Sequence, residues 1–218
     1  MNFDQGQLLR KATLRAKSDV ANKLVSMLLH ELSRRVNQES GLVVNGMVYS
    51  KLASSLFGNQ CPYCSRELLA KHVAVEHLDG MNRLRCGLHI PGNVVVSCSD
   101  CNREKRRDDQ CPNLYLAPSG WESFLSHDFS ACDKSCKTCG YWINLFKEPE
   151  LLRNHLHNAK EKIHRFRHIP EIAAALKVGQ QVQTAARETL ESFYREGQEY
   201  AQRRISELAD AAWPRKSQ

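Results

Sequence analysis

Four cysteines between positions 61 and 101 have the chemistry and the spacing of a metal site. Cys61 and Cys64 form a CPYC pair, and Cys98 and Cys101 form a CSDC pair. Four thiolates satisfy tetrahedral zinc without a water ligand, so we predict a closed, structural zinc site. Disulfides and a redox CxxC are the alternatives. Nothing in the sequence suggests export, and a redox motif would not come in duplicate around polar residues.

The stretch between the two pairs contains polar residues that could carry out a reaction. Residues 72–77 alternate as in a short strand, which ends in Glu76 and His77. Three valines at 94–96 predict a second short strand, and a helix is expected to begin near Cys101. The expected order is strand, loop, strand and helix, with zinc joining the lead-in of the first strand to the start of the helix.

This arrangement resembles the HNH endonucleases, which share a ββα-metal fold. Their pattern is an acidic residue and a histidine at the end of the first strand, an asparagine beginning the second, and a histidine or asparagine on the helix. CxxC pairs and a CNxxK ending often accompany it. The matching residues here are Glu76 and His77, then Asn93, then Asn102 within the segment CNREK.

The resemblance implies a role for each matching residue. His77 would be the general base that takes a proton from the attacking water. Glu76 and Asn102 would hold one divalent cation, Mg²⁺ or Mn²⁺. Asn93 would tie the loop down and orient His77. The helix also carries a basic cluster expected to contact nucleic-acid phosphates, which consists of Arg103, Lys105, Arg106 and Arg107.

The overall charge agrees with a polyanionic partner. The chain of 218 residues has a formal net charge of +7 and a pI near 9.0, which favours binding to DNA, expected to be double-stranded. No apolar run approaches the roughly 20 residues that a membrane span needs, and the first residues lack an apolar signal core. We therefore expect no membrane partner and a cytoplasmic, intracellular location.

We divide the chain into four regions: an N-terminal helical extension (1–57), the nuclease core (58–110), a segment rich in cysteine and aromatic residues (111–146), and a C-terminal helical region (147–218). The third region is expected to be loop-like, with aromatic side chains that fill a small core or stack on bases. A second zinc site is plausible there, with Cys86 or His127 as substitute ligands; buried or spare thiols are the alternative. Its four candidate ligands are Cys111, Cys132, Cys136 and Cys139.

Apolar residues recur at helical spacing in both flanking regions, from about 7 to 37 and again from Pro149 to the end. Gly179 and Gly197 interrupt the last stripe and could mark bends. That stripe could pack on the N-terminal helix, or on a second copy of the chain to give a homodimer. The C-terminal histidines are expected to be polar surface and not a metal site; they are His155, His157, His164 and His168.

The predicted fold is therefore α+β, with a small zinc-stapled ββα-metal (HNH) core flanked by N- and C-terminal helices. The predicted function is metal-dependent hydrolysis of DNA phosphodiester bonds. One alternative is a non-catalytic, zinc-stabilised nucleic-acid-binding module. Another is a helical scaffold protein whose zinc core only nucleates folding.

Overall fold

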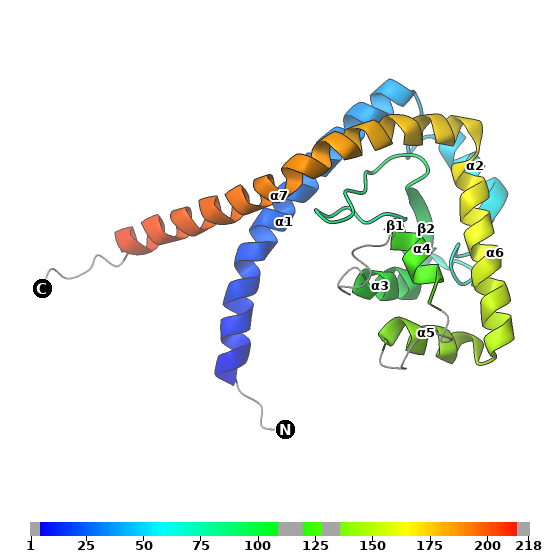
Figure 1. Ribbon diagram of the computed structural model, residues 1–218, viewed down its shortest axis with the longest axis horizontal. Coiled ribbons are helices and arrows are strands. Elements are labelled where there is room, and N and C mark those ends of the chain that lie inside the picture. Colours follow the sequence, from blue (N-terminus) through cyan, green and yellow to red (C-terminus); the bar gives the residue numbers. More distant parts are fainter. Residues whose placement is uncertain (1–4, 109–119, 128–135, 213–218) are drawn as a thin grey trace, which may run out of the picture.

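The computed structural model describes residues 5–108, 120–127 and 136–212 (Figure 1). These residues are mostly helical and include one two-stranded antiparallel sheet, so the predicted α+β class is confirmed. In chain order, the elements are α1 (Gln5–Ser40), α2 (Met47–Phe57), the 3₁₀ turn η1 (Ala70–His72), β1 (Val73–His77), β2 (Val94–Cys98), α3 (Ser99–Asp108), α4 (Gly120–Leu125), α5 (Lys137–Phe146), α6 (Pro149–Arg167) and α7 (Pro170–Ala212).

The sheet presents two different faces. β1 and β2 pair in a register that sets Glu76 opposite Val95 and Val75 opposite Val96. Successive side chains of a strand point to opposite sides, and α3 packs against both strands. Accordingly, Glu76 is 3% exposed, whereas Val75 and Val96 on the other face are 60% and 50% exposed. His77 follows Glu76 and so shares the outer face with Val75.

Helices α2, α4, α5 and α6 build the core around the sheet and the cysteine pairs. The sequence predicted a loop-like segment at 111–146. The structure corrects this, because α4 and α5 form within the segment. Trp121, Phe124 and Trp142 are at most 2% exposed, and the Trp142 Nε1–H donates to the Phe124 carbonyl at 3.1 Å. Burial of these rings accounts for the two short helices. These aromatic side chains fill a core, which is one of the two predicted roles.

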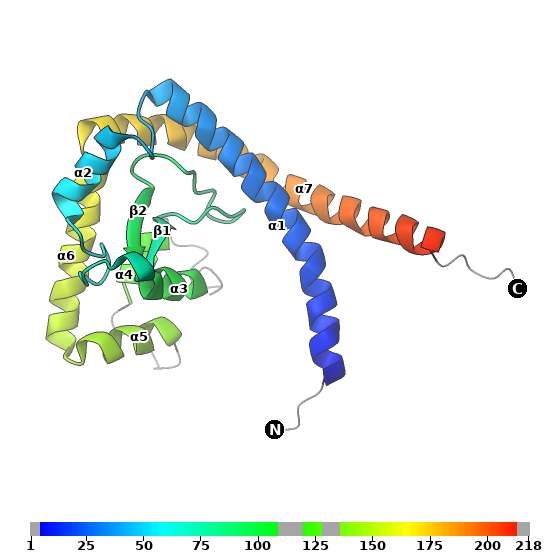
Figure 2. The same cartoon turned by 180° about the vertical axis from the view of Figure 1, so that it is seen from behind.

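The longest helices, α1 and α7, pack on each other and then diverge towards the two ends of the chain (Figures 1 and 2). They enclose a second core cluster together with part of the loop between β1 and β2. Packing of the C-terminal stripe on the N-terminal helix, one of the two predicted alternatives, is thus confirmed. α7 continues through Gly179 and Gly197. Both are points of close approach, since a Cβ would lie 2.3 Å from Ile90 Cδ1 at Gly179 and 3.0 Å from Leu24 Cδ1 at Gly197.

The described helices include none whose length and apolar character would let it cross a membrane.

Gly87 allows the loop between the strands to fold back on itself. Its N–H donates to the Gly80 carbonyl at 2.9 Å, and a Cβ there would lie 1.8 Å from the Asp79 carbonyl oxygen. Because backbone cannot move aside as a side-chain tip can, we expect Gly87→Ala to lower the free energy of unfolding by about 3 kcal/mol. Urea denaturation would measure this. Gly140→Ala is the control, because a Cβ in α5 meets nothing within 4 Å; an equal loss in both variants would contradict the prediction.

Candidate metal centre and catalytic site

The two cysteine pairs meet at one point of the core. The Sγ atoms of Cys61, Cys64, Cys98 and Cys101 all lie within 4.8 Å of one another, and those of Cys64 and Cys98 are 3.7 Å apart. Zinc–sulfur bonds of about 2.3 Å in a tetrahedron place the sulfurs about 3.8 Å apart. The four thiols therefore have the chemistry and the spacing to bind a metal such as zinc.

Neighbouring groups hold this cluster in place. The Cys101 N–H points at Cys98 Sγ at 3.4 Å, and the Tyr141 hydroxyl of α5 lies 3.0 Å from Cys101 Sγ. Hydrogen bonds from Cys101 lower the pKa of Cys98, and the same kind of bonds to the other thiols raise the pKa of Cys101. At the surface, Arg66 and Asp100 form an ion pair of 3.0 Å that links the two cysteine pairs. These contacts fix the positions of the two cysteine pairs relative to each other.

Glu76 lies on the inner face of β1 against a cation from α3. The Lys105 ammonium is 2.7 Å from Glu76 Oε1 and donates to the His77 carbonyl at 2.9 Å. The Tyr63 hydroxyl donates to the same carboxylate oxygen at 3.1 Å. Burial, with the Glu76 charge as a second cause, raises the pKa of Tyr63 well above its ordinary value, so this hydroxyl remains protonated. The carboxylate is held by two donors in a nearly dry environment.

His77 faces another histidine across the outer side of the strand end. Its Nε2 lies 3.0 Å from Nδ1 of His89, which belongs to the loop between the strands. The ring of His30 on α1 lies beyond, with its centroid 6.0 Å from that of His89. Burial, followed by the nearby His30, lowers the pKa of His89. The end of β1 therefore carries a carboxylate on one face and an imidazole pair on the other.

Asn93 fastens the two ends of the loop together. Its Oδ1 accepts from the Asp79 N–H at 2.7 Å, and its Nδ2 donates to the carbonyls of Asp79 at 3.0 Å and Leu88 at 2.8 Å. The Leu78 N–H donates to the Asn93 carbonyl at 2.8 Å. The predicted role of tying the loop down agrees with these contacts.

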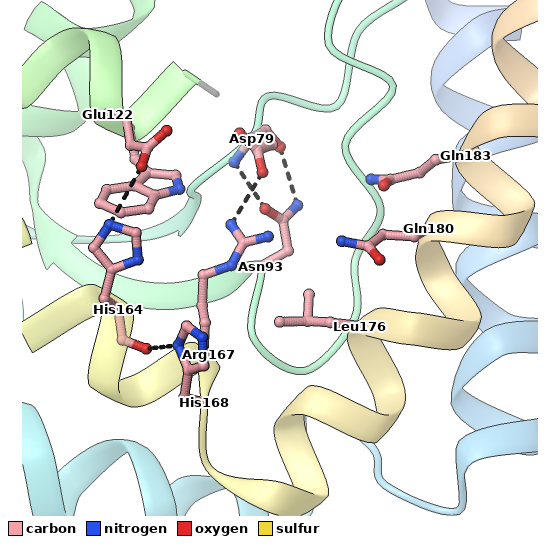
Figure 3. A pocket seen from close by; sticks show the side chains of 10 residues that line it. Asp79, Asn93, Glu122, His164, Arg167, His168, Leu176, Gln180 and Gln183 are labelled. Carbon is pink, nitrogen blue, oxygen red and sulfur yellow. Dashed lines mark hydrogen bonds and ion pairs between the residues drawn. The ribbon is translucent and has the colours of Figure 1, made fainter. Parts of the chain in front are cut away.

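A polar pocket of about 320 Å³ lies beside Asn93 and Asp79, between the loop, α4 and the junction of α6 with α7 (Figure 3). Arg167 reaches across from α6 to Asp79, with an Nη1–Oδ2 distance of 3.1 Å. His164 reaches Glu122 of α4 with an Nε2–Oε1 distance of 3.3 Å. Both carboxylates that line the pocket are therefore paired with basic side chains of α6. The Arg167 pair joins α6 to the loop, and the His164 pair joins α6 to α4.

The residues of the basic cluster on α3 differ in their exposure to solvent. Asn102 is half-buried, and the Arg103 side chain is 58% exposed and pairs with Asp100 at 2.9 Å and Glu104 at 3.5 Å. The Lys105 side chain is only 3% exposed. It lies inward against the strand end and not on the surface where a phosphate contact was expected, because the buried Glu76 carboxylate attracts its ammonium. The side chains of Arg106 and Arg107 lie outside the described part of the structure.

No family model, no curated protein and no solved structure matches the chain.

The predicted second zinc site is described only in part. Cys136 precedes the first turn of α5, and Cys139 is buried within that helix. Cys111 and Cys132 lie outside the described residues, so this site stays a prediction. Cys86, a possible substitute ligand, is buried with α1 and α7 in the second core cluster.

The C-terminal histidines are mostly at the surface, as expected. His157, His164 and His168 are exposed, whereas His155 is half-buried, because its Nε2 meets the Tyr63 carbonyl. Burial lowers the pKa of His155.

The contacts of two residues at the strand end could not be predicted from the sequence. Tyr63 lies inside the CPYC pair, and a tyrosine between ligands gives no sign that it reaches Glu76, which is 13 positions away. His89 stands in a loop without periodicity, so no pattern predicts its partner. Only the folded loop brings it to His77.

Proposed function

We propose that this chain is a metal-dependent endonuclease with a ββα-metal core of the HNH type, and that it hydrolyses DNA phosphodiester bonds. The observation that supports this most is the strand end, where the half-buried His77 imidazole follows the buried Glu76 carboxylate, which pairs with the Lys105 ammonium. A histidine that can act as a general base and a carboxylate that can bind a cation are two of the groups that metal-dependent phosphodiester hydrolysis uses. The cysteine cluster fixes the start of α3 against these strands.

His77 would act as the general base. A neutral imidazole takes a proton from a water molecule as that water attacks phosphorus, and general-base catalysis contributes about 10²- to 10⁴-fold. The exposed outer face of the sheet gives a backbone phosphate access to this ring. Arg103 on the adjacent helix would hold a neighbouring phosphate of the same strand.

Glu76 and Asn102 would hold the divalent cation, Mg²⁺ or Mn²⁺. The Lys105 ammonium contacts Glu76 Oε1 at 2.7 Å, so it would have to move aside for a divalent ion to bind that oxygen. Oxygen ligands from a carboxylate and an amide suit both metals. When bound, such a cation would supply charge stabilisation at the phosphate and the leaving oxygen.

Cleavage of supercoiled plasmid would test the proposal. We expect cutting that requires Mg²⁺ or Mn²⁺ and stops with EDTA, and His77→Ala should lower the rate by about 10²- to 10⁴-fold because the base is lost. His72→Ala is a matched control, since His72 is exposed just before β1. Metal content and melting temperature should remain unchanged in both variants. Equal cutting by wild type and His77→Ala would overturn the proposal.

The second candidate is a non-catalytic, metal-stabilised nucleic-acid-binding module. The Glu76–Lys105 pair favours it, because a carboxylate neutralised by its own chain has less need of a divalent ion. This candidate predicts DNA binding that weakens with salt, owing to counterion release. It also predicts equal binding by wild type and His77→Ala, with no cutting by either protein.

A further inference from the structure

The side chain of His89 lies against the ring of His77. The loop between β1 and β2 carries it back over the strand end, where its Nδ1 lies 3.0 Å from His77 Nε2. The two ring centroids are 5.2 Å apart with planes inclined at 58°. This distance is that of a hydrogen bond between the two imidazoles. His89 therefore engages Nε2 of His77, and Nδ1 lies on the other side of that ring.

Helix α1 fixes the position of His89 through its backbone. The His89 N–H donates to the Ser33 hydroxyl at 2.8 Å, and its carbonyl accepts from Asn37 Nδ2 at 3.1 Å. Ser33 is 2% exposed and donates in turn to the Leu29 carbonyl. Both backbone polar groups of His89 are thus held by one helix, at positions one turn apart.

The residues on either side of His89 are anchored as well. Leu88 and Ile90 are at most 1% exposed and belong to the core cluster between α1 and α7. Alternating burial leaves the His89 side chain pointing away from that cluster, half-buried and towards the strand end. A mobile loop could not hold an imidazole at a fixed angle, whereas this segment is packed between two helices.

We propose that His89 is a positioning residue for the proposed nuclease reaction, accepting the Nε2–H of His77 and so presenting His77 Nδ1 to the attacking water. This inference rests on the proposed function. One proton passes from water to His77 Nδ1, the water oxygen bonds to phosphorus, and the bond from phosphorus to the leaving oxygen breaks. The leaving oxygen takes a proton from solvent. The Nε2 proton stays on His77 throughout.

The protonation of His89 agrees with this role. Burial, and then the neighbouring His30, lower its pKa, which keeps the ring neutral near pH 7 with a lone pair on one nitrogen. A neutral His89 with its proton on Nε2 offers Nδ1 as an acceptor. The hydrogen bond then selects the His77 tautomer whose Nδ1 is unprotonated, as outer-shell partners do for histidines elsewhere.

Two substitutions separate this role from simple packing. His89→Leu removes the acceptor and puts an apolar side chain of similar size in its place. His89→Asn supplies an amide oxygen as the acceptor, close to the position of Nδ1. We expect His89→Leu to lower kcat by about 10- to 100-fold, the usual cost of losing an outer-shell partner, with KM little changed. His89→Asn should recover most of that loss. Melting curves would establish that both variants fold.

Nitrogen-15 NMR of the imidazoles provides a readout that does not depend on cutting. The His77 ring should be mainly the Nε2–H tautomer in wild type and in His89→Asn, and a mixture of both tautomers in His89→Leu. Wild-type kcat in His89→Leu, or an equal loss in both variants, would overturn the role of His89. Unchanged cutting by His77→Ala would instead overturn the proposed function, so the two failures are distinguishable.

Discussion

Removal of metal from the cysteine cluster is expected to unfold the core around the sheet. Structural zinc contributes about 10–16 kcal/mol in small zinc domains, which is comparable with the whole unfolding free energy of a typical protein, about 5–15 kcal/mol. All four cysteines belong to the core cluster that also contains Trp121 and Trp142. A strong chelator, or Cys98→Ser, should therefore abolish the near-ultraviolet circular dichroism of these rings.

Cys86→Ala is the matched control for the metal prediction. Cys86 is fully buried but belongs to the other core cluster, so its loss should leave metal content unchanged. Elemental analysis of wild type would show one bound zinc for this cluster, and two if the predicted second site also forms. A Cys98→Ser protein that keeps its tryptophan signals and melting temperature would show that the thiols pack without a metal.

Lys105→Met is expected to cost about 3–5 kcal/mol of unfolding free energy, the usual loss when one partner of a buried ion pair is removed. Methionine replaces most of the apolar stem, so the loss comes from the ammonium that contacts Glu76 Oε1 at 2.7 Å. The carboxylate, only 3% exposed, would remain in the core without that cation. Urea denaturation would measure the difference.

A double variant and added Mg²⁺ separate the causes of that loss. Glu76→Gln combined with Lys105→Met removes both charges and should recover most of the stability, because no buried charge is left without its partner. If Glu76 also binds a divalent ion, Mg²⁺ should raise the melting temperature of Lys105→Met more than that of wild type, since the ammonium no longer competes. An equal shift in both proteins would contradict a cation site at Glu76.

Residue types and their spacing predicted the cysteine cluster and the two strands of this protein. Two CxxC pairs bring four thiols together, because each pair can present both sulfurs to one ion. The alternating residues at 72–77 predicted β1, and the three valines at 94–96 predicted β2, each within one or two residues of the observed bounds. These features are local, so a short stretch of sequence determines them.

Contacts between distant segments were not predictable in the same way. Lys105 carries the same charge whether it lies at the surface or in the core, and only the packing of α3 on β1 decides that it meets Glu76. His89 meets His77 because α1 holds the loop through Ser33 and Asn37. The segment expected to be loop-like contains α4 and α5, because burial of its aromatic side chains outweighs local propensity.

The pairing of α1 with α7 also determines when the strand end is completed during synthesis. α1 is synthesised before the sheet and its partner α7 after it, so the buried stripe of α1 lacks this packing surface until α7 has been made. Contacts so distant in sequence form late in folding. Because α1 holds His89, a nascent chain that contains the cysteine cluster and His77 but not yet α7 would lack the helix pair that fixes His89 beside His77.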